Sequence, residues 1–154
     1  MTPDLALWPA LALAAFGAFL DWRERRLPNW LCAALAVAAG AGLAISQGVG
    51  LLLWALLHAV IALVIGMVLF ALGAFGGGDA KFYAAVACAI PATSAAQPVA
   101  LLGWTSLAGL VLLVFMMILR RTRKRTLSEG LLKGWEVPYG VAIAAGFFLT
   151  SFMG

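Results

Sequence analysis

The chain has 154 residues, of which 65% are hydrophobic and 10% are charged, against about 45–50% and about 25% in ordinary soluble domains. A soluble core of this size cannot bury such an apolar excess. The composition therefore excludes a soluble globular protein and predicts an all-α, polytopic membrane protein that forms one domain over residues 1–154. The net charge of +4 does not indicate nucleic-acid binding, because the basic residues cluster beside apolar stretches, where they determine membrane topology.

Six apolar stretches follow one another along the chain, each close to the length of about 20 residues that a helix needs to cross the hydrocarbon. The first and last are slightly short, and the fourth is the weakest because Pro91 lies inside it. The sequence therefore predicts a bundle of six transmembrane helices. Their expected ranges are 5–20, 30–45, 51–74, 80–96, 99–119 and 137–152.

The basic residues predict how these spans are oriented. With six spans, all 10 lysines and arginines fall on one face of the membrane, in residues 23–26, at Lys81 and in residues 120–133. Without the fourth span, residues 120–125 would lie opposite residues 23–26, which the positive-inside rule disfavours. We therefore expect the basic face to be cytoplasmic and both termini to lie on the other side.

Two of the six acidic residues lie at the edges of apolar spans. Asp21 ends the first span, and Asp79 follows Gly76, Gly77 and Gly78 just before the fourth. A carboxylate at the edge of the hydrocarbon is costly in free energy, so we interpret each of these two aspartates as a candidate functional residue. Because the charge rule places both on the cytoplasmic face, the sequence predicts a catalytic carboxylate pair.

A carboxylate pair can hydrolyse a peptide bond when the two groups share one proton. The ionised group takes a proton from water, and the protonated group polarises the scissile carbonyl. Desolvation at the membrane edge favours the shared proton, so we expect activity near neutral pH. The three glycines are expected to break the third span and to leave unwound backbone that pairs with an extended substrate. An ordinary turn capped by Asp79 is the structural alternative.

The remaining reactive side chains predict neither a metal site nor a cofactor. Cys32 and Cys88 lie in apolar stretches without CxxC spacing, so we expect small buried hydrophobes. His58 is the only histidine, and we expect it to pack inside the bundle with a local hydrogen bond. Lys81 lies two residues after Asp79, a spacing that points helical side chains apart. Lipid anchoring and electrostatic tuning of the pair both stay open for Lys81.

Three segments resemble motifs of the type IV prepilin peptidases. Residues 21–29 (DWRERRLPN) resemble the first aspartate motif, in which an Asp is followed by a basic residue and then by Ile/Leu-Pro-Asn. Residues 76–81 (GGGDAK) resemble the GxGD motif with its following Lys, and residues 137–140 (VPYG) resemble the Pro-aromatic-Gly segment. GxGD alone is weak, since presenilin-type proteases share it, but the three segments in this order are specific.

The resemblance implies a six-helix bundle with the GxGD aspartyl protease fold in the bacterial inner membrane. It implies Asp21 and Asp79 as the catalytic pair, which removes the basic leader of type IV prepilins or pseudopilins at the cytoplasmic face, with periplasmic termini. No cofactor and no nucleic-acid partner are expected, and the oligomeric state is left open. The expected substrate contacts are Gly76, Gly77, Gly78 and Lys81.

The beginning of the chain indicates which type of member it resembles. The long bacterial members carry an N-terminal cytoplasmic insert with paired cysteines and also N-methylate the new N-terminus. This chain begins directly at its first predicted span, so it is similar to the short, peptidase-only type associated with Flp/Tad pili. We therefore expect cleavage of Flp-type prepilins without methyl transfer.

Three alternatives stay open. A small multipass transporter or channel subunit would use Asp21 and Asp79 to bind a cation or relay protons, although the spans contain no continuous polar path. A scaffold protein without chemistry would use Asp79 only as a helix cap. A presenilin-like enzyme that cuts inside the bilayer usually has its other aspartate in a Tyr-Asp context, whereas Asp21 follows Leu20.

Overall fold

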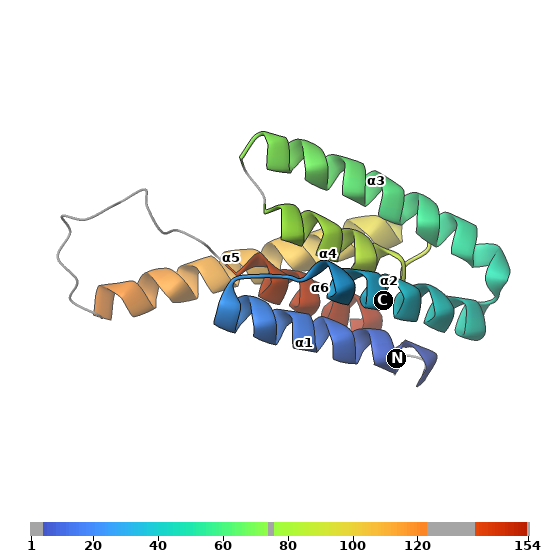
Figure 1. The fold of residues 1–154 in the computed structure, drawn as a ribbon, viewed down its shortest axis with the longest axis horizontal. Helices are drawn as coiled ribbons and strands as arrows, with labels where there is room; N and C mark the ends of the chain where they lie inside the picture. Colours follow the sequence, from blue (N-terminus) through green and yellow to red (C-terminus); the bar gives the residue numbers. More distant parts are fainter. Residues whose placement is uncertain (1–4, 74–75, 123–137, 154) are drawn as a thin grey trace.

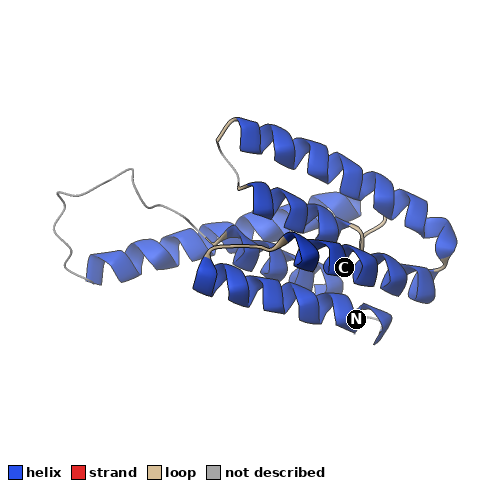
Figure 2. Ribbon diagram, viewed as in Figure 1, coloured by secondary structure: helices blue, strands red, loops and turns tan. Residues whose placement is uncertain are grey.

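The computed structural model describes residues 5–73, 76–122 and 138–153, which form a bundle of six α-helices (Figure 1). Helices and short connections make up this described part (Figure 2), which confirms the all-α prediction. The elements in chain order are η1 (Leu5–Leu7), α1 (Trp8–Glu24), α2 (Asn29–Gln47), η2 (Val49–Leu51), α3 (Leu52–Ala71), α4 (Gly77–Ala87), α5 (Ala96–Thr122) and α6 (Tyr139–Met153).

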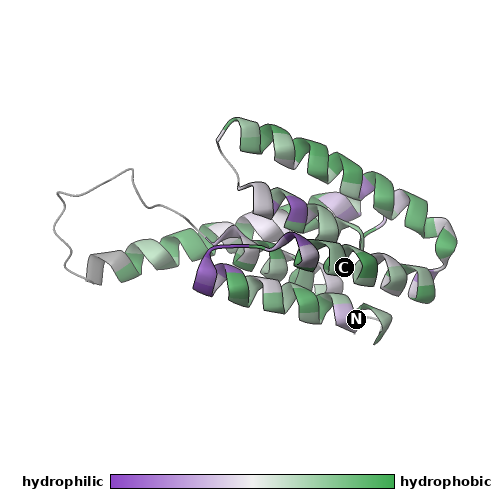
Figure 3. Cartoon of the chain, in the orientation of Figure 1, coloured by the Kyte–Doolittle hydropathy of each residue, from purple (hydrophilic) through white to green (hydrophobic). Residues whose placement is uncertain are grey.

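The bundle has the surface of a polytopic membrane protein. Large apolar side chains are exposed along α3 and α5, and polar residues gather at the C-terminal end of α1 and in its connection to α2 (Figure 3). The shorter helix α6 is also apolar. Among the described helical segments, those long and apolar enough to cross a membrane are Leu5–Glu24, Asn29–Gln47, Val49–Ala71 and Ala96–Leu119.

Five of the six predicted spans coincide with helices to within a few residues, but the prediction for the fourth was wrong in its extent. Helix α4 has 11 residues and ends at Ala87 rather than at residue 96. Pro91 explains this end, because inside a helix its ring would clash with the carbonyl of Ala87 and it has no N–H to donate. That carbonyl instead accepts a tight-turn bond from the N–H of Ile90 at 3.0 Å. The predicted boundaries at residues 74 and 137 lie outside the described residues.

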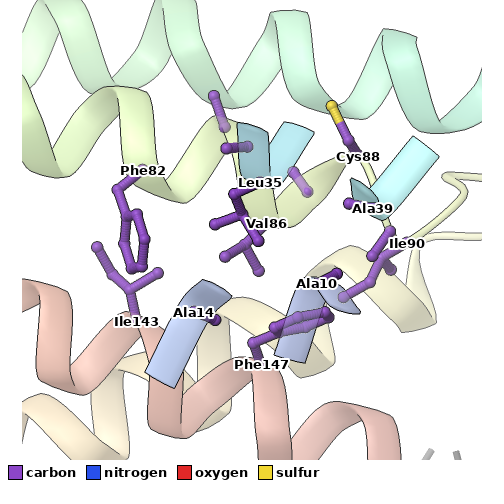
Figure 4. Packing of buried hydrophobic residues seen from close by; sticks show 14 of the residues in the cluster. Ala10, Ala14, Leu35, Ala39, Phe82, Val86, Cys88, Ile90, Ile143 and Phe147 are labelled. Carbon is purple, nitrogen blue, oxygen red and sulfur yellow. The ribbon is translucent and has the colours of Figure 1, made fainter. Parts of the chain in front are cut away.

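The short helix α4 lies at the centre of the bundle and packs against α2, α3 and α6. Every residue from 84 to 91 is buried. Figure 4 shows Phe82 of α4 facing Ile143 of α6, with Ala10 and Ala14 of α1 lying beside Phe147. Small residues at these positions let the helices approach closely in lipid. This packing fixes the N-terminal end of α4 relative to α1 and α6.

Helices α1 and α6 pack side by side and run antiparallel, since the start of α6 bonds to the end of α1 through Gly140 and Asp21. The two ends of the described chain, at Leu5 and Met153, therefore both lie at the opposite end of the bundle from this contact.

His58, Cys32 and Cys88 are buried, as predicted. His58 is 6% exposed, and its Nδ1 donates to the carbonyl oxygen of Ile90 at 2.9 Å. This bond holds the chain just after the end of α4. Cys32 and Cys88 are buried and form no disulfide.

Candidate active site

Asp21 lies in the last turn of α1 and is only 6% exposed. Its Oδ2 accepts a hydrogen bond from the backbone N–H of Gly140 at 2.8 Å. Gly140 is the second residue of α6, where backbone N–H groups have no partner within the helix. The positive end of the helix dipole lies at the same place. The start of α6 therefore holds the Asp21 side chain and offsets part of the cost of burying a negative charge there.

The chain turns sharply just after Asp21. Helix α1 is closed by Arg25 in the left-handed conformation (φ 55°, ψ 34°), and the Arg25 N–H donates to the Asp21 carbonyl at 3.0 Å. This is the usual geometry of a helix C-terminus. The connection to α2 then passes the start of α4, where a Cβ on Gly78 would lie 3.4 Å from the Cβ of Leu27. The end of α1 and the start of α4 are thereby brought together.

Asp79 is the third residue of α4, which follows Gly76 in an extended conformation (φ −76°, ψ 141°). The Asp79 carboxylate accepts a hydrogen bond from the backbone N–H of Gly76. This reach from the third helical residue back to the N-cap is one half of a capping box. The structural alternative is thus correct in part, because Asp79 does cap α4. A capping bond still leaves acceptor and donor capacity on the carboxyl group for chemistry.

The two carboxyl groups lie near enough for the charge of Asp21 to act on Asp79, although 58 residues separate them in the sequence (79 minus 21). Asp79 is half-buried and lies just ahead of the apolar segment over residues 80–96. Burial and, to a smaller extent, the negative charge of Asp21 raise the pKa of Asp79 to about 6, while the hydrogen bond from Gly76 opposes the rise. Two acidic groups that sense each other in this way favour a state with one shared proton.

Each of the two carboxylates rests directly against a glycine. A Cβ on Gly140 would lie 2.9 Å from both the Cβ and the Oδ2 of Asp21, closer than real Cβ contacts allow. A Cβ on Gly76 would collide with the Oδ2 of Asp79. Glycine is therefore required at both positions for the carboxylates to reach the backbone N–H groups that hold them.

The three consecutive glycines do not form one unwound segment. Gly76 is extended, but Gly77 and Gly78 are the first two residues of α4. The prediction of unwound backbone was therefore wrong for these two, because the capping bond of Asp79 starts the helix at Gly77. Their N–H groups belong to the first turn, where the helix itself supplies no acceptor. They lie next to Asp79 in the chain.

Lys81 is exposed at the start of α4, and its Nζ donates to the Oδ1 of Asn29 at 3.0 Å. Asn29 is the first residue of α2, so this bond ties the starts of two helices together beside Asp79. Neither this bond nor the bond from Gly140 to Asp21 was predicted from the sequence. The one sequence signal for these two bonds was that all four residues lie in segments that resemble family motifs.

The described residues include no cluster of three or more His, Cys, Asp or Glu side chains that could hold a metal ion. In the comparison with known proteins, the family model of the type IV leader peptidase family matches residues 8–119. That segment includes α1 to α4, most of α5 and both aspartates. No curated protein and no solved structure matches the chain significantly.

Proposed function

The chain belongs to the type IV leader peptidase family, and we propose that it is an aspartic endopeptidase with Asp21 and Asp79 as its catalytic pair. The proposed substrate is a type IV prepilin or pseudopilin of the Flp type, from which the leader peptide is removed. The observation that supports this best is the pair itself. The charge of Asp21 acts on Asp79, and each carboxylate is held by a backbone N–H at the start of a helix.

The surroundings of the pair favour a division of roles between the two groups. Burial disfavours the ionised form of Asp21, and the Gly140 N–H and the positive end of α6 offset part of that cost. Burial and the nearby negative charge favour a proton on Asp79. We assign Asp21 as the general base and Asp79 as the general acid of the first step, while the titration itself belongs to the pair.

These roles give a balanced hydrolysis. Asp21 takes a proton from the attacking water while the water oxygen bonds to the scissile carbonyl carbon. Asp79 gives its proton to the carbonyl oxygen in the same step. The resulting tetrahedral diol then collapses. Asp21 passes its proton to the departing nitrogen as the C–N bond breaks, and a diol hydroxyl returns a proton to Asp79.

We further propose that the substrate backbone is bound at the start of α4. Gly76 is extended, and the N–H groups of Gly77 and Gly78 have no acceptor within the helix, so a substrate carbonyl can accept from them. Lys81 is exposed beside this turn and is proposed as a further substrate contact, in addition to its bond with Asn29.

The proposed location is the bacterial inner membrane, with the site at the cytoplasmic face and both termini in the periplasm. Arg23, Arg25 and Arg26 lie within five residues after Asp21, and Lys81 follows Asp79 by two residues. Positive charge is thus concentrated at the end of the bundle that holds the pair, as the positive-inside rule expects of a cytoplasmic face. A prepilin presents the junction between its basic leader and its apolar helix at the same depth.

Incubation of the purified, membrane-reconstituted protein with a Flp-type prepilin tests this function. Mass spectrometry is expected to find the released leader and a shortened pilin, with no added methyl group even when S-adenosylmethionine is present. Intact prepilin after incubation with folded protein would contradict peptidase activity. A methylated N-terminus would contradict the expectation that the chain resembles the peptidase-only type.

A transporter receives no support from the buried polar side chains. Among the described residues these are Asp21, His58 and Thr150. His58 is bonded to the carbonyl of Ile90, and Thr150 donates to the carbonyl of Gly146. They form no continuous polar path along the bundle, as proton or cation transport requires.

The cleavage rate is expected to follow a bell-shaped dependence on pH. Because the pKa of Asp79 is raised to about 6, its proton is present below that pH and is lost as the pH rises through it, so kcat/KM should fall on the alkaline side. In acid Asp21 also becomes protonated, no base remains, and the rate falls again. We expect an optimum in the mildly acidic range, below the Asp79 pKa of about 6, which is more acidic than the near-neutral activity expected from the sequence. An optimum below about pH 4 would contradict the assigned roles.

A further inference from the structure

A groove of about 540 Å³ runs between α3 and α5, with α4 forming its floor. Helix α3 packs mainly on α4, and α5 packs mainly on α6, so no described helix fills the space between α3 and α5. The walls are mostly aliphatic. The titratable side chains in the described lining are His58 and two tyrosines, and this lining holds no Asp, Glu, Lys or Arg. The groove therefore suits an apolar occupant.

One end of the groove lies beside the carboxylate pair. Ala80 lines the groove and directly follows Asp79. Tyr139 also lines it and directly precedes Gly140, whose N–H holds Asp21. The groove therefore ends next to the residue that carries one carboxylate and next to the residue that holds the other.

The length and lining of the groove match a helix. Its wall on α5 extends from Pro98 to Leu113, about 22 Å at a rise of 1.5 Å per residue, which is most of the hydrocarbon thickness of about 30 Å. Ser106 is a small residue on the α5 wall, and Ala62 is a small residue on the α3 wall. Such residues allow another helix to approach closely in lipid, where packing rather than hydrophobicity drives association.

We propose that this groove receives the apolar helix of the substrate, the segment that follows the leader peptide, and this proposal rests on the function proposed above. With its helix between α3 and α5, the substrate places the residues that precede the helix over Asp21 and Asp79. The groove then sets which peptide bond is cut, because the distance from the seated helix to the pair fixes the register of cleavage.

Cysteine cross-linking tests this placement. Ser106 lines the groove, whereas Val111 lies on the same helix outside the lining and is 61% exposed. Each is changed to Cys in an Asp79→Asn background, and the protein is oxidised together with a Flp-type prepilin that carries one cysteine in its apolar helix. Ser106→Cys is expected to form a disulfide adduct with the prepilin, and Val111→Cys is not. The native Cys32 and Cys88 are buried, and the Asp79→Asn protein alone measures their background.

A blocking substitution gives a second readout in the active protein. Ser106→Trp is expected to fill the groove and to lower kcat/KM for the prepilin by about tenfold or more, while Val111→Trp stays within about twofold of wild type. Thermal unfolding of both variants checks that they are folded to the same extent.

The outcomes separate this proposal from the function on which it rests. If the wild-type protein cleaves the prepilin, the groove proposal is overturned when no adduct forms at Ser106→Cys or when adducts form equally at both positions. It is also overturned when Ser106→Trp cleaves as fast as Val111→Trp. Any of these three results would mean that the groove holds lipid chains only. If the wild-type protein does not cleave at all, the proposed function itself fails.

Discussion

Asparagine in place of either Asp21 or Asp79 is expected to abolish leader cleavage, with a loss in rate of about 10²- to 10⁴-fold or more. Asparagine is nearly isosteric with aspartate but cannot ionise or share a proton. Asp21→Asn removes the base that activates water, and Asp79→Asn removes the acid that polarises the scissile carbonyl. The measurement is release of the leader from a Flp-type prepilin by equal amounts of each purified variant.

Both variants are expected to fold, which separates catalysis from stability. The amide oxygen of Asn can still accept the hydrogen bonds from Gly140 and from Gly76 that the carboxylates accept now. Glu24→Gln is the matched control, because Glu24 lies in the same last turn of α1 but is exposed, and it should cleave as wild type does. Full cleavage by either aspartate variant would remove the proposed mechanism.

A single added methyl group at Gly140 is expected to produce the second large effect. In Gly140→Ala the new Cβ would lie 2.9 Å from the Cβ and the Oδ2 of Asp21, so the carboxylate or the start of α6 must shift. Displacing a catalytic group by about 1 Å costs on the order of 10²-fold in rate. We expect kcat/KM for prepilin cleavage to fall by about that factor, measured on protein still held in the membrane.

Gly103→Ala is the control for this substitution. Gly103 lies within α5, and a Cβ there would meet no heavy atom within 4 Å. Alanine is preferred over glycine inside a helix by about 1 kcal/mol, so this variant should be as stable and as active as wild type. If Gly140→Ala cleaves as fast as Gly103→Ala at equal amounts of folded protein, Asp21 is not held by the start of α6.

The helices could be predicted largely from the lengths of the apolar stretches, but the fourth could not. Residues 80–96 are predominantly apolar in sequence, yet residues 84–91 are buried within the bundle, where α4 packs against α2, α3 and α6. A central segment of this kind does not need to cross the bilayer as one helix, so Pro91 could end α4 early without exposing backbone to hydrocarbon. Hydropathy alone does not distinguish burial inside a bundle from burial in lipid.

That Asp21 and Asp79 lie near each other was predictable from charge, because the positive-inside rule assigns both to one face of the membrane. The groups that hold them were not. A backbone N–H has no sequence signature, and the bonds from Gly140 to Asp21 and from Lys81 to Asn29 join positions 119 and 52 residues apart. Glycine propensity likewise predicted an unwound run, whereas the capping bond of Asp79 makes Gly77 and Gly78 helical.

The separation of the two acid groups around a bound substrate tests the proposed chemistry most directly. This separation can be measured in a structure of the protein bound to a prepilin whose scissile bond is replaced by a non-cleavable mimic. We predict carboxyl oxygens of Asp21 and Asp79 roughly 3 Å apart or bridged by one water, on either side of the mimic's carbonyl position. A side chain lying between the two acids, or a mimic placed beside only one of them, would contradict an aspartic mechanism in this protein.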